Sequence, residues 1–196
     1  FSRLNDCTNF LMVGTLEIRK GHTQVLDAFE LLWHQDVDIN LVLVGKEGWL
    51  VEDLSKRLLN HSELNKRLFW FEGISDECLE KIYTISTCLI AASYDEGFGL
   101  PLIEAAQNRL PIIARDIPVF REVAGEHAHY FIAESPTELK YCLEQWLALY
   151  KTDQHPQSVN MPWLTWKESA NQLLQILTLI EPIESTSNNV KLKHQK

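Results

Sequence analysis

The sequence has no long apolar run and little positive charge, and both absences narrow the classes of protein to consider. No hydrophobic stretch approaches the ~20 residues that a membrane-spanning helix needs. Lysine and arginine number 18 against 27 aspartate and glutamate residues, so the net charge is −9. This acidic balance argues against nucleic acid as a partner of the bulk surface.

Cysteine is scarce, and its spacing disfavours metal and disulfide frameworks. The four cysteines form no Cys-x-x-Cys pair and show no zinc-ligand spacing: Cys7, Cys78, Cys88 and Cys142. Two of them lie on apolar runs, so we expect reduced core thiols in a cytoplasmic protein. The chain begins at Phe1 rather than at methionine and shows no signal peptide, and we expect it to be a piece of a longer protein.

The chain does contain a regular alternation of short apolar runs and amphipathic segments. With 196 residues and 45% hydrophobic content, it can bury the core of one domain. The apolar runs are typical of buried parallel strands, and we expect strands at 9–14, 39–45, 68–71, 88–92, 111–115 and 130–132. Helical spacing and helix-start signals predict helices at 25–33 and 51–59, after Ser75, after Gly99, from Pro118, and at 136–150 and 163–180.

This alternation predicts an α/β fold, a Rossmann-like doubly wound parallel sheet with helices on both faces. If the strand order is the common 3-2-1-4-5, it reverses between the first and fourth strands. Ligands bind in the crevice at such a reversal, where the loops 14–21 and 93–99 would lie. We assign residues 1–180 to one domain, with a polar linker at 151–160 before the terminal helix, and residues 181–196 to a disordered tail.

One stretch combines several site-like features, Ser93 to Ala106, with the sequence Ser-Tyr-Asp-Glu-Gly-Phe-Gly-Leu-Pro-Leu-Ile-Glu-Ala-Ala. Gly97 and Gly99 allow a tight turn that brings backbone N–H groups close to a ligand. The helix start that follows carries unpaired N–H groups and partial positive charge, which suits a phosphate. Two carboxylates, Glu96 and Glu104, bracket the turn. A purely structural turn with a solvated acidic helix face is the alternative.

The run Glu96-Gly-Phe-Gly-Leu-Pro-Leu-Ile-Glu104 resembles the Glu-x7-Glu signature of retaining glycosyltransferases of family 4, which have the two-domain GT-B architecture. The glycines, the proline and Ala105-Ala106 match together with the two acids, and the resemblance extends from about Phe10 to Tyr130. It implies that this chain is the C-terminal, donor-binding domain, one half of a GT-B fold. The N-terminal acceptor domain would then be absent from this chain.

Within the signature, the resemblance implies a role for each polar group. Glu104 would accept hydrogen bonds from the vicinal hydroxyls of a ribose, and Glu96 would face the hydroxyls of the transferred sugar. Backbone N–H groups would meet the diphosphate, and they belong to Gly97, Phe98, Gly99 and Leu100. Such enzymes are thought to retain configuration by same-face attack, so the protein has to stabilise charge on the leaving diphosphate.

A second group of candidates lies in the loop Gly14-Thr-Leu-Glu-Ile-Arg-Lys-Gly21, where Arg19 and Lys20 could neutralise a diphosphate. Many family members carry Gly-Arg-Leu-x-x-x-Lys-Gly here, so Lys20 corresponds directly, whereas Thr15 replaces the arginine. Whether Arg19 substitutes for that arginine stays open, as does the alternative that both cations are solvated. Gly14 and Thr15 complete this part of the predicted binding site. Two cations and a helix start can act in place of a divalent ion, so we expect no metal and no cofactor.

Two further features are less specific. Gly73 and Ile74 follow the third strand, where the resemblance implies contact with the nucleotide base, although a plain turn fits nearly as well. Trp163 and Trp166 stand at the head of the terminal helix and resemble the closing Trp segment of the family. For these two side chains we expect packing rather than stacking on a sugar.

Together these features predict the donor-binding half of a retaining hexosyltransferase of polysaccharide or O-antigen assembly, inactive as an isolated chain. The expected partners are a nucleoside-diphosphate sugar, GDP-mannose first, and the missing N-terminal domain. Through that domain the cytoplasmic enzyme would associate peripherally with the inner face of the plasma membrane. Two alternatives stay open, a non-catalytic nucleotide-binding module and a sugar-nucleotide epimerase of the same architecture. An NAD-dependent oxidoreductase fits worse, because the first strand-turn lacks Gly-x-Gly-x-x-Gly.

Overall fold

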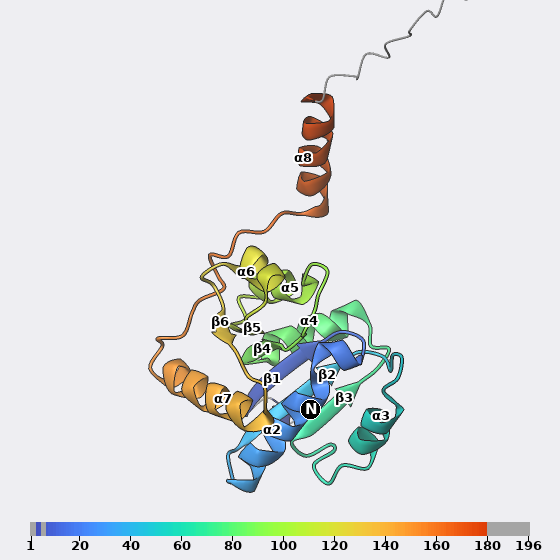
Figure 1. The fold of residues 1–196 in the computed structure, drawn as a ribbon, viewed down its shortest axis with the longest axis vertical. Helices are drawn as coiled ribbons and strands as arrows, with labels where there is room; N and C mark the ends of the chain where they lie inside the picture. The colour runs from blue at the N-terminus through green and yellow to red at the C-terminus, as the bar shows by residue number, and fades with distance from the viewer. Residues whose placement is uncertain (1–2, 5–6, 180–196) are drawn as a thin grey trace, which may run out of the picture. The chain divides into compact units, whose positions relative to one another are not determined.

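Six parallel strands form one sheet at the centre of the fold (Figure 1). The computed structural model describes residues 3–4 and 7–179. The order across the sheet is β3-β2-β1-β4-β5-β6, and every neighbouring pair is parallel. The strands span Thr8–Val13 (β1), Ile39–Val44 (β2), Leu68–Phe71 (β3), Cys88–Ala91 (β4), Ile112–Arg115 (β5) and His129–Phe131 (β6).

Helices alternate with the strands along the chain, as the sequence predicts. They are the 3-10 turn Ile18–Lys20 (η1), His22–His34 (α2), Glu52–Leu59 (α3), Asp76–Ile85 (α4), Leu100–Gln107 (α5), Pro118–Ala124 (α6), Pro136–Lys151 (α7) and Trp166–Leu179 (α8). Among the described residues, none of these helices is long and apolar enough to cross a membrane.

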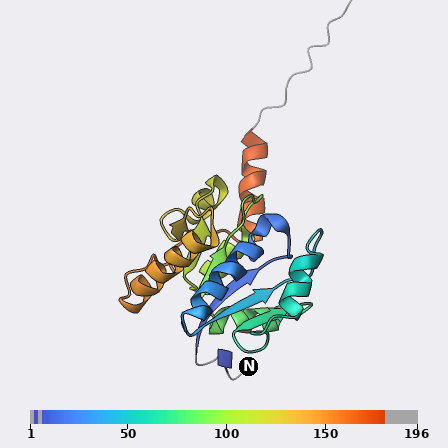
Figure 2. The ribbon, with the colours of Figure 1, turned by 60° about the horizontal axis from the view of Figure 1, so that its bottom comes forward.

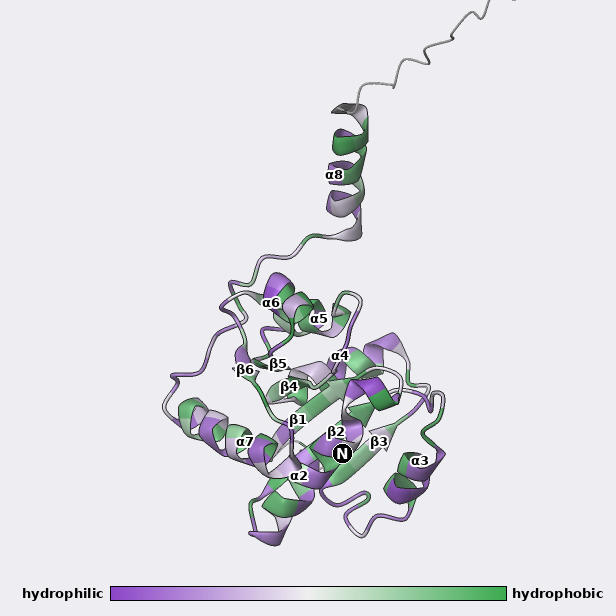
Figure 3. Cartoon of the chain, viewed as in Figure 1, coloured by the Kyte–Doolittle hydropathy of each residue, from purple (hydrophilic) through white to green (hydrophobic). Residues whose placement is uncertain are grey.

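The sheet separates two apolar layers, because neighbouring residues of a strand point to opposite faces. In β1, Phe10 and Met12 join the layer formed with α2, α3 and α7, whereas Leu11 joins the layer formed with α4, α5 and α6. β2 divides in the same way, with Leu43 in the first layer and Val44 in the second. Figure 2 shows the first layer, with α2 (blue), α3 (teal) and α7 (orange) on one side of the sheet, and Figure 3 shows the hydrophobic strands that it covers.

The strand order reverses between β1 and β4. β1 pairs with β2 on one side and with β4 on the other, where Phe10 lies opposite Cys88. Successive crossovers lead outward from β1 to β3 and from β4 to β6, so the loops after β1 and β4 leave the same edge of the sheet and diverge. The predicted fold class, strand order and switch point are confirmed.

Capping contacts confirm two predicted helix starts. At the start of α4, Ser75 Oγ accepts a hydrogen bond from the Cys78 N–H group at 3.4 Å. At the start of α7, Ser135 forms a complete capping box with Glu138, whose Oε2 accepts from the Ser135 N–H group at 3.1 Å. Each contact satisfies a helix-end donor that would otherwise lack a partner.

The segment after α7 differs from the polar linker that we predicted. His155 and Ser158 are buried, and the Ser158 hydroxyl donates to the Leu110 carbonyl at 2.8 Å. The His155 ring packs edge-on against Trp146, with 5.8 Å between ring centroids, and Met161 enters the second apolar layer. These polar side chains can be buried because distant parts of the chain provide their contacts, which local composition does not reveal.

A second compact unit begins at Trp163 and contains α8. Thr165 and Glu168 cap this helix, with the Glu168 N–H group donating to Thr165 Oγ1 at 3.2 Å and the Thr165 N–H group donating to Glu168 Oε2 at 2.8 Å. Trp166 is exposed, and its expected packing stays a prediction. The predicted tail at 181–196 lies outside the described residues.

Candidate functional site

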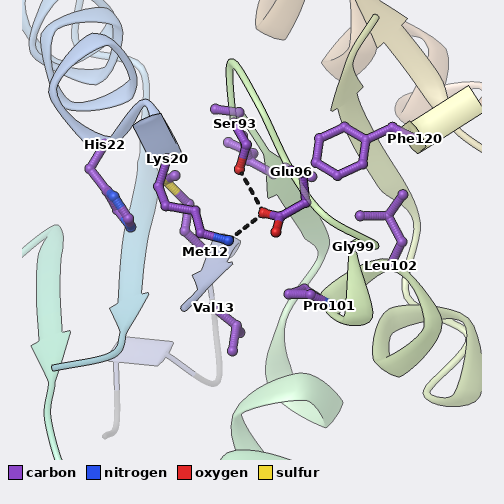
Figure 4. A pocket seen from close by; sticks show the side chains of 13 residues that line it. Met12, Val13, Lys20, His22, Ser93, Glu96, Gly99, Pro101, Leu102 and Phe120 are labelled. Atoms are coloured by element: carbon purple, nitrogen blue, oxygen red, sulfur yellow. Dashed lines mark hydrogen bonds and ion pairs between the residues drawn. The ribbon is translucent and has the colours of Figure 1, made fainter. Parts of the chain in front are cut away.

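A shallow cavity opens at the switch point (Figure 4), and its volume reaches about 330 Å3 only when the open solvent at its mouth is counted. The ends of β1 and β4, the first turns of α2 and α5, and one side chain of α6 line it. We call it the switch-point cavity. The polar side chains of its lining are Lys20, His22, Ser93 and Glu96.

Glu96 is held by donors from both loops. Lys20 Nζ forms an ion pair with its carboxylate across the cavity, as Figure 4 shows. The Ser93 hydroxyl donates to Glu96 Oε2 at 3.3 Å, and the Gly97 N–H group donates to Oε1 at 3.2 Å. The Glu96 side chain is 14% exposed. Glu96 and Lys20 are therefore paired and enclosed, unlike the solvated charges of the alternative interpretation.

The pKa of Glu96 lies below its ordinary value. Burial raises this pKa, but the hydrogen bond and charge of Lys20, the Gly97 N–H group and the charge of Arg19 outweigh it. The carboxylate is therefore ionised at neutral pH, and it can act as a hydrogen-bond acceptor for a ligand.

Arg19 lies at the rim of the cavity. Its side chain is 45% exposed, against 15% for Lys20. Arg19 Nε pairs with Glu17 Oε2 at 2.8 Å. Its Nη1 donates to the Asp95 carbonyl at 3.1 Å and lies 3.5 Å from Glu96 Oε1. The structure thus brings both predicted cations to the β4–α5 loop, one inside the cavity and one at its edge.

Glycine allows the two loops to approach each other and the neighbouring elements. Gly21 has a φ of +74°, and a Cβ there would lie 2.4 Å from the Ala92 carbonyl oxygen. Gly99, directly before α5, has a φ of +89°, and a Cβ there would lie 3.1 Å from the Phe120 ring. Any other residue at Gly21 would separate the loops, because both its backbone conformation and its side chain would be strained.

Glu104 lies on the second turn of α5 and does not line the cavity. Its Oε2 accepts a hydrogen bond from the Tyr83 hydroxyl at 2.6 Å. Tyr83 is 3% exposed, and burial, together with the charge of Glu104, raises its pKa, so the phenol keeps its proton. A carboxylate has about four acceptor positions, so Glu104 retains capacity for a ligand. No pattern in the sequence indicated this contact.

The structure brings only some of the predicted binding residues to the cavity. Gly99 lines it, and Gly14 lies beside the Lys20 side chain, since a Cβ there would be 3.9 Å from Lys20 Cε. Four others are exposed, in the same two loops or at the first residue of α5: Thr15, Gly97, Phe98 and Leu100. Gly73 and Ile74 follow β3, which β2 separates from β1, and neither lines the cavity.

His22 is a polar residue of the cavity that the sequence analysis did not single out. It is the first residue of α2 and is 3% exposed. Burial and, second, the charge of Lys20 lower its pKa to about 4, against the opposing effect of a hydrogen bond between the ring and the Glu17 backbone. Its ring Nδ1 is buried and has no hydrogen-bond partner. Its position directly after Lys20-Gly21 was the only available signal.

Arg115, at the end of β5, forms a hydrogen bond with the start of the β4–α5 loop. It is 8% exposed, and its Nε and Nη1 donate at 3.0 Å to the Ala92 and Ala133 carbonyls. The guanidinium also donates to Gln24 Oε1 and lies 4.0 Å from the centroid of the Tyr94 ring. These contacts fix the end of β4 against α2 and β5. The sequence gave no reason to expect a buried cation there.

In the part of the chain that the structure describes, the cysteines form no disulfide and the potential metal ligands form no metal site. The four cysteines are free thiols in this structure. Burial raises the pKa of the Cys88 and Cys142 thiols, which keeps both protonated. Within the same residues, no three His, Cys, Asp or Glu side chains are grouped so that they could hold a metal ion.

Comparison with known protein families extends to most of the chain. Residues 4–158 match the family described as Glycosyl transferases group 1, and this range includes the whole switch-point cavity. The chain belongs to this family. The resemblance carried by the run Glu96 to Glu104 is thereby confirmed at the level of the group 1 glycosyl transferases.

Mannosyltransferases are among the curated relatives of this group 1 glycosyl transferase. The serotype-specific mannosyltransferase WbdA of Escherichia coli is 56% identical over 174 residues, which cover 89% of this chain and 21% of WbdA. The O-antigen chain mannosyltransferase RfbU of Salmonella typhimurium is 40% identical over 92 residues, which cover 46% of this chain and 26% of RfbU. The chain thus spans only a minor part of the length of each relative.

Solved structures of the same fold include a domain of another member of the group 1 family. The C-terminal domain of the group 1 protein LpcC from Francisella tularensis superposes with a TM-score of 0.65 at 19% identity, over 85% of this chain and 86% of that one. Anabaena HepE, solved in complex with UDP and glucose, gives a TM-score of 0.69 at 15% identity, over 90% of this chain and 50% of HepE. At these identities the likeness concerns the fold.

Proposed function

We propose that this chain is the donor-binding domain of a retaining hexosyltransferase of family 4, which transfers mannose from GDP-mannose to a saccharide or lipid-linked acceptor. The observation that carries this proposal is the switch-point cavity, where Lys20, Arg19 and the glycine turn of the signature meet in a group 1 glycosyl transferase. The 56% identity to WbdA supports mannose as the transferred sugar.

In the proposed complex, the diphosphate lies between Lys20 and the start of α5. The backbone N–H groups of residues 97–100 and the partial positive charge of the helix start would bind its oxygens. Lys20 would supply a point charge, and Arg19 a planar guanidinium from the rim. As the bond between sugar and diphosphate breaks, these groups would stabilise the negative charge that grows on the leaving group.

Lys20 would serve both the diphosphate and Glu96. In this structure its ammonium pairs with the Glu96 carboxylate. An ammonium has three donors, so it can contact a phosphate oxygen while it keeps or exchanges this partner. Glu96 would then accept hydrogen bonds from hydroxyls of the transferred mannose, and would orient the sugar without attacking it.

The nucleoside would extend from the diphosphate along the same edge of the sheet. We propose that Glu104, oriented by the Tyr83 hydroxyl, accepts hydrogen bonds from the ribose hydroxyls. Gly73 and Ile74, at the end of β3, would contact the base through the main chain and one apolar side chain. Phe98 and Leu100, both exposed, would lie against the ligand at the mouth of the cavity.

The N-terminal domain of the whole enzyme would bind the acceptor. We assign residues 1–180 to the donor domain and place the enzyme in the cytoplasm, at the inner face of the plasma membrane. Because transfer requires donor and acceptor to be held together, we expect the purified chain to transfer no sugar. Rapid transfer of labelled mannose to a saccharide by this chain alone would contradict the two-domain account.

Calorimetric titration tests the proposed ligand class directly. We expect GDP to bind more tightly than UDP or ADP, and the affinity to be the same with and without a chelator, because Lys20 and Arg19 provide the positive charge. A stronger affinity for NAD than for any nucleoside diphosphate would contradict the proposal. So would GDP binding that is lost when the chelator is added.

A further inference from the structure

The charged side chains around the switch-point cavity balance one another. Lys20 and Arg19 are cations, Glu96 and Glu17 are anions, and ion pairs join all four. A nucleoside diphosphate adds at least one negative charge on each phosphate. Helix N-termini offset part of that charge. Any further hydrogen-bond donor or positive charge has to come from a side chain that these pairs do not already engage.

His22 fits this requirement. It begins α2, follows Lys20-Gly21 and lines the same cavity as Lys20 and Glu96. In Figure 4 it lies on the Lys20 side of the cavity, opposite Glu96 and the α5 start. The residue is 3% exposed, and its buried Nδ1 has no partner. Buried polar atoms of folded proteins nearly always have a partner, so this nitrogen requires an explanation.

A second histidine shows that burial alone does not make such a site. His155 also has a buried Nδ1 without a partner. Its ring, however, lies among aromatic neighbours, with centroids 5.8 Å from Trp146 and 5.0 Å from Tyr150. It does not line the switch-point cavity. Of these two histidines, His22 alone combines the unpartnered nitrogen with a place in the wall of the cavity that holds the signature.

Resting on the function proposed above, we propose that His22 is a ligand-binding residue of the switch-point cavity and that its ring Nδ1–H donates a hydrogen bond to a phosphate oxygen of the bound nucleoside diphosphate. The first-turn N–H groups of α2 have no acceptor within the helix, and they would face the same phosphate. The diphosphate would then lie between the starts of two helices, α2 and α5, with Lys20 between them.

This contact would change the protonation of the ring. The charged groups around the cavity come from the β1–α2 loop, the β4–α5 loop and β5: Glu17, Arg19, Lys20, Glu96 and Arg115. Burial and Lys20 lower the pKa of His22 to about 4, so the ring is neutral at neutral pH. A phosphate oxygen at Nδ1 favours the charged form and raises this pKa. The ring would take up a proton from solvent on binding, and GDP affinity would increase as the pH falls.

The test is calorimetric titration of the chain with GDP at about pH 6, in two buffers with different ionisation enthalpies. We expect the wild type to take up more protons per bound GDP than His22→Gln, whose amide can donate but cannot be protonated. His22→Leu should lose about tenfold in affinity. His155→Gln is the matched control, a buried histidine outside the cavity, and should bind GDP as the wild type does.

Equal proton uptake by the wild type and His22→Gln would overturn the inference, and so would equal affinity of the wild type and His22→Leu. If the His22 variants do not fold, the 15N chemical shifts of the His22 ring in the wild type decide, because Nδ1 has to shift when GDP is added. GDP binding that depends on Lys20 but not on His22 overturns this inference and leaves the proposed function intact. Absence of GDP binding by the wild type overturns both.

Discussion

The start and the middle of α2 both contact charged side chains, but the contacts at the start leave donors free and those in the middle do not. At the start, Lys20 reaches across the switch-point cavity to Glu96 on another loop, and His22 has an unpartnered ring nitrogen. The middle of α2 contributes to a set of ion pairs and hydrogen bonds that we call the α2–α3 cluster. It consists of Asp27, Glu30, Arg57 and His61.

In the α2–α3 cluster each of these side chains has a partner on the other segment. Arg57 Nη2 lies 2.6 Å from Asp27 Oδ1 and 2.8 Å from Glu30 Oε2. His61 Nε2 lies 2.8 Å from Glu30 Oε1. Glu30 and His61 also line a hollow with Trp33, whose ring packs edge-on against His61. This cluster joins two segments by contacts that are complete within the chain, whereas the switch-point cavity retains donors for a ligand.

Removal of one cation from the switch-point cavity and one from the α2–α3 cluster should give the largest difference in GDP affinity between the two regions. Lys20→Met should weaken GDP binding about ten- to a hundredfold, because a charged hydrogen bond contributes roughly 1.5–3 kcal/mol. Arg57→Met should leave GDP affinity unchanged and lower the free energy of unfolding by about 1 kcal/mol or less. Calorimetry and urea unfolding measure the two effects. Equal GDP affinity in the wild type and Lys20→Met would remove the functional distinction between the regions.

Removal of single carboxylates sharpens the comparison within the site. Glu104→Ala should weaken GDP and GDP-mannose together by about tenfold or more, because both ligands contain the ribose. Glu96→Ala should weaken GDP-mannose alone, because only the intact donor carries the sugar. Glu30→Ala, in the α2–α3 cluster, is the control and should affect neither ligand. If Glu96→Ala harms GDP binding more than Glu104→Ala does, the two roles are reversed.

The Tyr83 hydroxyl should have a smaller effect, because it acts through Glu104. Tyr83→Phe keeps the ring and removes the 2.6 Å hydrogen bond to the carboxylate. We expect GDP affinity to fall about three- to tenfold, the value of one ordinary hydrogen bond. Tyr150→Phe, on α7, is the matched control and should bind GDP like the wild type. An unchanged affinity in Tyr83→Phe would mean that this contact does not orient Glu104 for a ligand.

The smallest expected effect concerns the α2–α3 cluster, which should change how the free energy of unfolding depends on pH in the acid range. Burial raises the pKa of Glu30, but hydrogen bonds from Arg57 and His61 outweigh it, so this pKa lies below its ordinary value. The stabilisation is present above that ordinary value of 4.5 and is lost as the pH falls through the lower pKa of the folded state. Urea unfolding between neutral and acid pH should therefore show a shallower loss in Glu30→Gln than in the wild type. Identical slopes would contradict the role of Glu30.

Local patterns in the sequence were sufficient to predict the fold. The apolar runs at β1 and β4 and the helix-start signals at Ser75 and Ser135 depend on residues close together in the chain. The alternation of strands and helices then limits the topology, and the reversal between β1 and β4 follows. The buried segment around His155 was missed because its contacts with α7 and Leu110 join distant positions.

The sequence predicted those parts of the candidate site that lie within a single loop and have a recognisable pattern of residues. The glycine turn and Lys20 were found because they match a family signature, and Arg19 because it stands next to Lys20 in the loop after β1. The pairing of Lys20 with Glu96 spans 76 residues, and the contact of Tyr83 with Glu104 spans 21. Such pairings, and the orphan nitrogen of His22, are consequences of packing between loops, and no local pattern of residues encodes them.

A crystal structure of this chain with GDP would show whether the diphosphate binds at the switch point. We expect electron density for the diphosphate in the switch-point cavity, with Lys20 Nζ and the N–H groups at the start of α5 within hydrogen-bond distance of its oxygens. Glu104 should contact the ribose. Density for GDP in the hollow beside His61, or a switch-point cavity without GDP at saturating concentration, would contradict the proposed binding site.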